Sequence, residues 1–144
     1  MSAEPPGRRT ARVILVDSSV WVLADRGRHP IGDFVEPDDI VICPPIAQEL
    51  LQGAQDRERY WAIRDVLALV TMLDAAIPLA RFQEAAWIYV RCREAGYTIR
   101  SSVDCLIAAC AMAHHVELLH DDRDFDFIAK VTALQARRVS PSRS

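Results

Sequence analysis

Five acidic residues have the types and positions that a metal-dependent reaction would use. They are Asp17, Glu49, Asp104, Asp122 and Asp124. When several carboxylates meet in one cleft, their mutual repulsion raises their pKa values, and a divalent cation removes that penalty. Hard oxygen ligands without paired histidines or cysteines nearby select Mg²⁺ or Mn²⁺ over Zn²⁺. The residue types therefore predict a site for Mg²⁺, with Mn²⁺ as a substitute, if the fold brings the acids together.

Each of these acids also has an ordinary structural explanation. Asp17 could cap a helix that follows a strand, and Glu49 could be a solvated helix residue. Asp104 could complete a capping box with Ser101, and the last two acids could be turn or cap residues. Two features argue against these explanations. Asp17 follows a strand that should be buried, where an unpaired carboxylate is costly, and Asp104 opens a helix that is apolar almost all round.

The hydrophobic pattern places the acids in a chain of alternating strands and helices. Strands are predicted at 13–16, 40–42, 71–73, 116–120 and 136–139. Helices are predicted at 20–24, 44–51, 55–70, 78–95, 103–114 and 125–131. This alternation predicts an α/β fold with a mostly parallel sheet that helices cover on both faces. Ligands of such folds sit at the carboxyl ends of the strands, where Asp17, Asp122 and Asp124 fall.

The bulk composition is that of an ordinary soluble protein with one domain. The chain has 144 residues, of which 51% are hydrophobic and 26% are charged. Because the formal net charge is −3, nucleic-acid binding would need local patches or bound cations. No segment has the apolar length of a membrane span or a signal peptide, so we expect a cytoplasmic protein. We expect a flexible tail at 1–12, a single domain at 13–139 and a C-terminal tail at 140–144.

Four sequence motifs carry the acids. They are VDSSVW at 16–21, IAQELLQG at 46–53, IRSSVDCLIAA at 99–109 and LLHDDRDF at 118–125. In this order and at these separations they resemble the PIN-domain family and, within it, the VapC-type toxins. The resemblance runs from about Val13 to Ile128. It implies a three-layer α/β/α PIN-like fold with a central, mostly parallel sheet.

The resemblance also implies roles for individual residues. Those that match the family's catalytic acids are Asp17, Glu49, Asp104 and Asp122, and the same four with Asp124 would be the metal ligands. Ser19 stands where the family often has a small polar residue that supports the metal site. The adjacent Asp121 remains an alternative to Asp122 as the fourth acid.

Three further side chains near the acids have two interpretations each. Arg100 and Arg123 flank the acids and could contact RNA phosphates, or they could be ion-pair partners of the carboxylates. His120 stands at a strand end near the acids and could assist proton transfer, or it could have no part in the reaction.

The activity implied by the resemblance is metal-dependent endonucleolytic cleavage of single-stranded or loop RNA. Metal-activated water would be the nucleophile, leaving 5′-phosphate and 3′-hydroxyl ends. The implied partners are an RNA substrate and a small, VapB-like antitoxin that neutralises the toxin. A homodimer or a toxin–antitoxin hetero-oligomer is expected, without a membrane.

Other functions remain compatible with the sequence. One is a PIN nuclease outside toxin systems, acting in RNA processing or on DNA. Another is a metal-dependent phosphatase, although haloacid-dehalogenase-like enzymes usually need a second aspartate where this chain has Ser19. An inactive binding module is the third, and the presence of all the acids argues against it.

Overall fold

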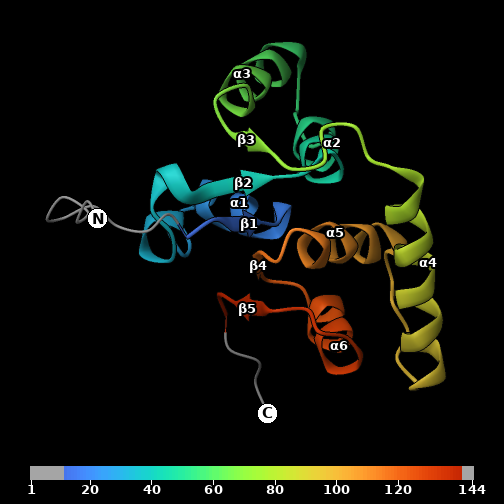
Figure 1. The fold of residues 1–144 in the computed structure, drawn as a ribbon. Coiled ribbons are helices and arrows are strands. Elements are labelled where there is room, and N and C mark those ends of the chain that lie inside the picture. Colours follow the sequence, from blue (N-terminus) through green and yellow to red (C-terminus); the bar gives the residue numbers. More distant parts are fainter. Residues whose placement is uncertain (1–11, 141–144) are drawn as a thin grey trace, which may run out of the picture.

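The computed structural model describes residues 12–140 (Figure 1). The tails predicted at 1–12 and 140–144 lie outside the described residues, except for Arg12 and Ser140. Within the described range, no helix combines the length and the apolar character needed to cross a bilayer.

Five short strands form one parallel sheet. They are β1 (Ile14–Val16), β2 (Ile40–Ile42), β3 (Thr71–Met72), β4 (Glu117–His120) and β5 (Ala136–Arg138). Their order across the sheet is β3-β2-β1-β4-β5, and every pairing is parallel. Leu15 of the central strand lies opposite Val41 on one side and Leu118 on the other. The predicted α/β class is confirmed, and the sheet is parallel throughout rather than mostly so.

Six α-helices connect the strands. They are α1 (Ser18–Asp25), α2 (Pro44–Gln52), α3 (Arg57–Leu67), α4 (Leu79–Glu94), α5 (Ser102–Ala113) and α6 (Arg123–Val131). Two short 3-10 helices, η1 (Ile31–Asp33) and η2 (Pro37–Asp39), lie between α1 and β2 and were not predicted. Helices α1 and α6 both begin two residues before their predicted starts. In each, an aspartate side chain accepts a backbone N–H of the first turn and extends the helix to that aspartate.

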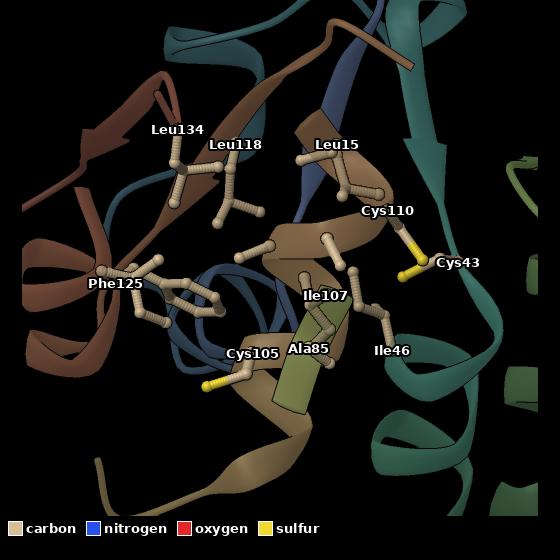
Figure 2. Packing of buried hydrophobic residues seen from close by; sticks show 14 of the residues in the cluster. Leu15, Cys43, Ile46, Ala85, Cys105, Ile107, Cys110, Leu118, Phe125 and Leu134 are labelled. Atoms are coloured by element: carbon tan, nitrogen blue, oxygen red, sulfur yellow. The ribbon is translucent and has the colours of Figure 1, made fainter. Parts of the chain in front are cut away.

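Apolar layers cover both faces of the sheet because successive strand residues point to opposite sides. Leu15 packs into the larger core with residues of α2, α4, α5 and α6, whereas Ile14 and Val16 pack with Val20 of α1 on the other face. Figure 2 shows α5 at the centre of the larger core, with Ile107 of this helix among the labelled side chains. The result is the predicted three-layer arrangement, with α5 buried along most of its length.

Candidate metal centre

Asp17 stands at the carboxyl end of β1 and caps α1 with one of its two oxygens. Its Oδ2 accepts hydrogen bonds from the Ser19 backbone N–H at 3.1 Å and from the Ser19 hydroxyl at 2.6 Å. The residue is only 3% exposed, and its Oδ1 is buried without a hydrogen-bond partner. The capping role proposed from the sequence is therefore real, but it uses only half of the carboxylate.

Asp122 and Asp124 bring the start of α6 to the same end of the sheet. Asp122 caps α6, because its Oδ1 accepts the Asp124 N–H at 2.9 Å. The Oδ2 of Asp124 accepts the backbone N–H groups of Arg100 at 3.0 Å and Ser101 at 3.2 Å. The remaining Asp124 oxygen is buried without a partner. Asp124 thus ties α6 to the segment that leads into α5.

Asp104 does not form the capping box that its spacing from Ser101 allowed. The Ser101 side chain makes no capping hydrogen bond, and the Ser101 N–H is bound by Asp124 instead. Asp104 is 4% exposed, and its Oδ2 has no partner. Its place in the first turn of a buried helix directs it into the molecule, as the apolar sequence of α5 predicted.

The five acids form one electrostatic cluster. One oxygen each of Asp104, Asp122 and Asp124 lie within 4.8 Å of one another. Burial, followed by the negative charges of the other four acids, raises the pKa of Asp104 to about 9. Burial also raises the pKa of Asp17, against the lowering effect of its hydrogen bonds from Ser19. The pKa of Glu49 is raised by burial and by the charge of Asp17.

The chemistry of this cluster fits a hard divalent cation. Each of four acids leaves one buried oxygen without a hydrogen-bond partner: Asp17 Oδ1, Glu49 Oε1, Asp104 Oδ2 and Asp124 Oδ1. Unpartnered buried carboxylate oxygens are costly in a protein interior, and a divalent cation would satisfy several of them at once. The donors are all oxygens, which suits Mg²⁺ or Mn²⁺.

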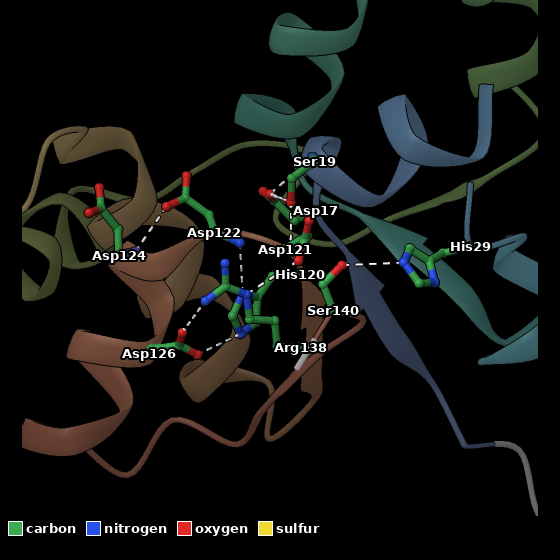
Figure 3. Close-up of polar contacts among 10 residues, drawn as sticks. All are labelled: Asp17, Ser19, His29, His120, Asp121, Asp122, Asp124, Asp126, Arg138 and Ser140. Atoms are coloured by element: carbon green, nitrogen blue, oxygen red, sulfur yellow. Dashed lines mark hydrogen bonds and ion pairs between the residues drawn. The ribbon is translucent and has the colours of Figure 1, made fainter. Parts of the chain in front are cut away.

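Three further residues lie beside Asp17 and Asp122, namely Ser19, Asp121 and His120 (Figure 3). None of them has a buried oxygen without a partner. The Ser19 hydroxyl donates to Asp17 and accepts the Asp121 N–H at 2.9 Å. The Asp121 carboxylate pairs with Arg138 at 3.2 Å, whereas the Asp122 carboxylate lies in the cluster. The Nδ1 of His120 accepts the Asp122 N–H at 3.1 Å. His120 is 1% exposed, and burial lowers its pKa.

Arg138 and Asp126 are neighbours of the cluster that the sequence did not reveal. Arg138 of β5 binds Asp126 at 2.7 Å as well as Asp121, and Asp126 also lies 3.7 Å from the Nε2 of His120. Arg138 is twelve residues from Asp126 and seventeen from Asp121. No local motif relates residues at such separations, and only the position of β5 beside β4 would have suggested the contact.

The two candidate phosphate-binding arginines are exposed. Neither Arg100 nor Arg123 forms an ion pair with another residue in the range 12–140. Within this range, therefore, neither is an ion-pair partner of the carboxylates. The Arg100 backbone N–H binds Asp124, and the Arg123 guanidinium lies 5.9 Å from the centre of the Phe127 ring. Arg100 thus contacts the cluster through its backbone, and Arg123 stands between Asp122 and Asp124 in the sequence.

Comparisons with known proteins give a consistent result. Residues 14–131 match the family described as "PIN domain". "VapC ribonuclease Mb1587" of Mycobacterium bovis and "Ribonuclease VapC11" of Mycobacterium tuberculosis are each 40% identical to this chain over 133 residues. Each match covers 86% of this chain and 97% of the relative.

Solved structures have the same fold at lower sequence identity. VapBC2 from Rickettsia felis, bound to a DNA fragment from its promoter, has a TM-score of 0.70 at 16% identity and covers 89% of this chain and 99% of that one. VapBC-5 from Mycobacterium tuberculosis has a TM-score of 0.66 at 20% identity and covers 90% of this chain and 100% of that one. These values show a shared fold.

Proposed function

The chain belongs to the PIN-domain family and, within it, to the VapC proteins, and from this premise we propose that it is a metal-dependent endoribonuclease toxin. The observation that carries the proposal is the group of buried carboxylate oxygens without partners at the carboxyl ends of the strands. Its relatives are named as ribonucleases, which supports RNA as the substrate.

The proposed ligands of the cation are Asp17, Glu49, Asp104, Asp122 and Asp124. Bound Mg²⁺ or Mn²⁺ would supply an activated water and neutralise charge at the phosphate. Asp17 is oriented by Ser19, and the start of α5 is held by Asp124 through two backbone N–H groups. The chain thus fixes the direction of its carboxylates before the substrate arrives, which is the condition for efficient electrostatic catalysis.

The substrate we propose is single-stranded or loop RNA, cut to leave 5′-phosphate and 3′-hydroxyl ends. Arg100 and Arg123 would hold phosphates next to the bond that is cut, because both are exposed and both lie next to Asp124 in the chain or through a backbone contact. A chain of net charge −3 can bind RNA in this way, since the cation and these arginines supply the local positive charge.

The proposed partner is a small VapB-like antitoxin, acting with the toxin in the cytoplasm. Several similar structures are VapBC complexes, and this chain has apolar surface that a partner would cover. A groove of about 610 Å³ is lined by Pro44, Ala47, Gln48, Leu51, Gln52, Tyr60, Met72 and Ala75. Trp61, Phe82 and Trp87 are also exposed, each by about half or more. We propose that the antitoxin and a second toxin chain cover these surfaces in a hetero-oligomer.

Cleavage of total cellular RNA by purified, antitoxin-free protein tests the proposal. We expect discrete cuts with 5′-phosphate ends in Mg²⁺ or Mn²⁺, and none in EDTA or with Asp17→Asn or Asp104→Asn. Cleavage that survives both substitutions would contradict the assigned site. Hydrolysis of a small phosphomonoester without RNA cleavage would indicate a phosphatase instead, and neither activity in folded protein would indicate a binding module.

A further inference from the structure

One face of α6 carries two cations and an aromatic ring, and a second ring, from the segment between α4 and α5, packs against them. Arg123, Phe127 and Lys130 follow one another at helical spacing and so share a face. The Arg123 guanidinium lies 5.9 Å and the Lys130 amine 6.0 Å from the centre of the Phe127 ring. The Lys130 amine is also 5.6 Å from the Tyr97 ring, which stacks on Phe127 at 4.8 Å. We call Arg100, Arg123, Lys130, Tyr97 and Phe127 the basic–aromatic strip.

The strip begins at the metal centre. Helix α6 starts directly after Asp122, and Asp124 lies in its first turn. The segment between α4 and α5 carries both Tyr97 and Arg100, and the Arg100 N–H is bound to Asp124. Seven residues of helix place Lys130 about 10 Å from Arg123 along the axis. Arg123 and Lys130 therefore follow one another along α6, which starts at Asp122 and Asp124.

The charges of the strip are available to an external anion. Within residues 12–140, Arg100, Arg123 and Lys130 form no ion pair, whereas Arg81 and Arg138 are each bound by two carboxylates. An aromatic ring beneath a cation restricts its movement without neutralising it. Such cations lose less conformational entropy when they bind a phosphate than fully mobile ones do.

We propose that the basic–aromatic strip binds the backbone phosphates of single-stranded RNA and leads the strand into the metal centre. The inference rests on the proposed nuclease function and adds the path of the substrate. Such a path is needed because the acid cluster itself repels RNA, and the net charge of −3 gives no general attraction. A row of cations recognises the backbone and not the bases. None of the exposed large apolar side chains, which a protein partner would use, is on α6.

The first test is the salt dependence of RNA binding. Fluorescence anisotropy with labelled oligouridylate in EDTA measures binding without cleavage. Arg123→Met and Lys130→Met remove one charge each but keep the apolar stem that covers the ring. Each should lower the slope of log K against log salt by about 0.7, the value for one phosphate contact to a single strand. Arg64→Met is the matched control, because Arg64 lies 5.4 Å from the Trp61 ring on α3.

The second test uses Lys130 as a reporter, since it is the only lysine in the chain. Reductive methylation with carbon-13 formaldehyde labels only this side chain and the α-amino group, and it preserves the charge. We expect oligouridylate in EDTA to shift the Lys130 methyl resonance, and the shift to disappear at high salt. An unchanged resonance at saturating RNA would contradict the proposal.

The outcomes separate this inference from the proposed function. RNA cleavage by wild-type protein, with salt slopes unchanged in both strip variants, would overturn the strip and leave the nuclease intact. A slope that falls only in Arg64→Met would indicate that RNA binds along α3, and would also contradict RNA binding by the strip. Weaker antitoxin binding with unchanged RNA binding would assign the strip to the protein partner. If both strip variants lower the salt slope and RNA shifts the Lys130 resonance, but no metal-dependent cleavage occurs, the proposed nuclease function is wrong and the strip remains.

Discussion

At the scale of single residues, two acids of the candidate site use one carboxylate oxygen for local structure and leave the other without a partner. Asp17 binds Ser19 with one oxygen, and Asp124 binds two backbone N–H groups with one oxygen. In both residues the second oxygen is buried without a partner. Conventional caps would expose that oxygen to water, so its burial distinguishes this site from ordinary helix capping.

The substitution Asp104→Asn should separate stability from metal binding. At neutral pH the Asp104 carboxyl, whose folded-state pKa is about 9, must take up a proton on folding, whereas the asparagine amide needs none. The variant should therefore be more stable than wild type without metal, by more than about 1 kcal/mol or a few degrees in Tm. We expect Mg²⁺ to stabilise the wild-type protein and to have no such effect on the variant. Thermal unfolding in EDTA and in Mg²⁺ measures both effects. A lower Tm of the variant in EDTA would mean that Asp104 has a structural role that the carboxylate alone fulfils.

The raised pKa of Asp104 also predicts how stability depends on pH. Its folded-state pKa of about 9 lies above the ordinary value of 3.8, so the folded protein retains a proton that the unfolded chain loses. This contribution to stability is complete below pH 3.8 and is lost as the pH rises to about 9.

Denaturant unfolding of wild type and Asp104→Asn in EDTA isolates this contribution, because other titrating groups affect both proteins. The stability of wild type relative to the variant should fall as the pH rises through this window. A constant difference between pH 5 and 8 would contradict the assigned pKa shift.

His120 should act through the hydrogen bond that its Nδ1 accepts from the Asp122 N–H. The oxygen of asparagine can replace Nδ1, whereas glutamine more nearly replaces Nε2. We therefore expect His120→Asn to keep most of the Mn²⁺ affinity, and His120→Gln and His120→Ala to lose about 10–100-fold. Calorimetric titration with Mn²⁺ measures the affinities of the three variants. Equal losses in all three variants would indicate that the ring matters only through its packing on Phe125.

At the scale of elements, the site depends on how α5 and α6 are joined. The Oδ2 of Asp124 binds the two N–H groups immediately before α5, and Asp104 lies in the first turn of that helix. The position of Asp104 is therefore set by a residue of a different helix. This long-range connection explains why the local S-x-x-D pattern predicted a capping box that the structure does not form.

Two substitutions at Asp124 should have different effects. Asp124→Ala leaves two N–H groups without their acceptor and should destabilise the protein by about 2–3 kcal/mol. Asp124→Asn keeps an oxygen acceptor and should preserve most of the stability while weakening Mn²⁺ binding. Hydrogen exchange at Arg100 and Ser101 should accelerate only in the alanine variant. Faster exchange in both variants would show that the charge of Asp124, not its acceptor geometry, holds α5.

The elements were predictable from sequence because their signals are local. Continuous apolar runs correspond to strands that are buried on both faces, and the strand at Ile40–Ile42 has its predicted bounds. The positions of the acids at strand ends and helix starts followed from the same pattern. The pairing of Arg138 with Asp121 and Asp126 did not, because it depends on the order of strands in the sheet. The short helices η1 and η2 carry no periodic signal.

At the scale of the whole molecule, the sheet order places the edge strand β5 beside β4 and the loop that carries Asp121 and Asp122. The family match ends at residue 131, so β5 lies beyond it. β5 nevertheless pairs with β4, and the Val139 N–H donates to the His120 carbonyl at 2.9 Å. The last described strand thus supports the loop between β4 and α6 from outside the matched segment.

Substitution of Arg138, with its neighbour Arg137 as the control, tests whether β5 supports this loop. Arg138 binds two carboxylates with its side chain 26% exposed, whereas Arg137 pairs with Glu117 with its side chain 44% exposed. Arg138→Met should lower stability by about 1–2 kcal/mol, because two half-buried carboxylates lose their cation. Arg137→Met should cost less than about 1 kcal/mol, since it breaks a more exposed pair.

Hydrogen exchange locates the effect of these two substitutions. In Arg138→Met the Asp121 and Asp122 amides should exchange faster, because the Arg138 ion pairs hold the loop in which these amides bind Ser19 and His120. The same amides should be unchanged in Arg137→Met, whose ion pair lies at the opposite end of β4. Equal acceleration in both variants would mean that β5 stabilises the sheet edge as a whole and that Arg138 has no particular role at the site.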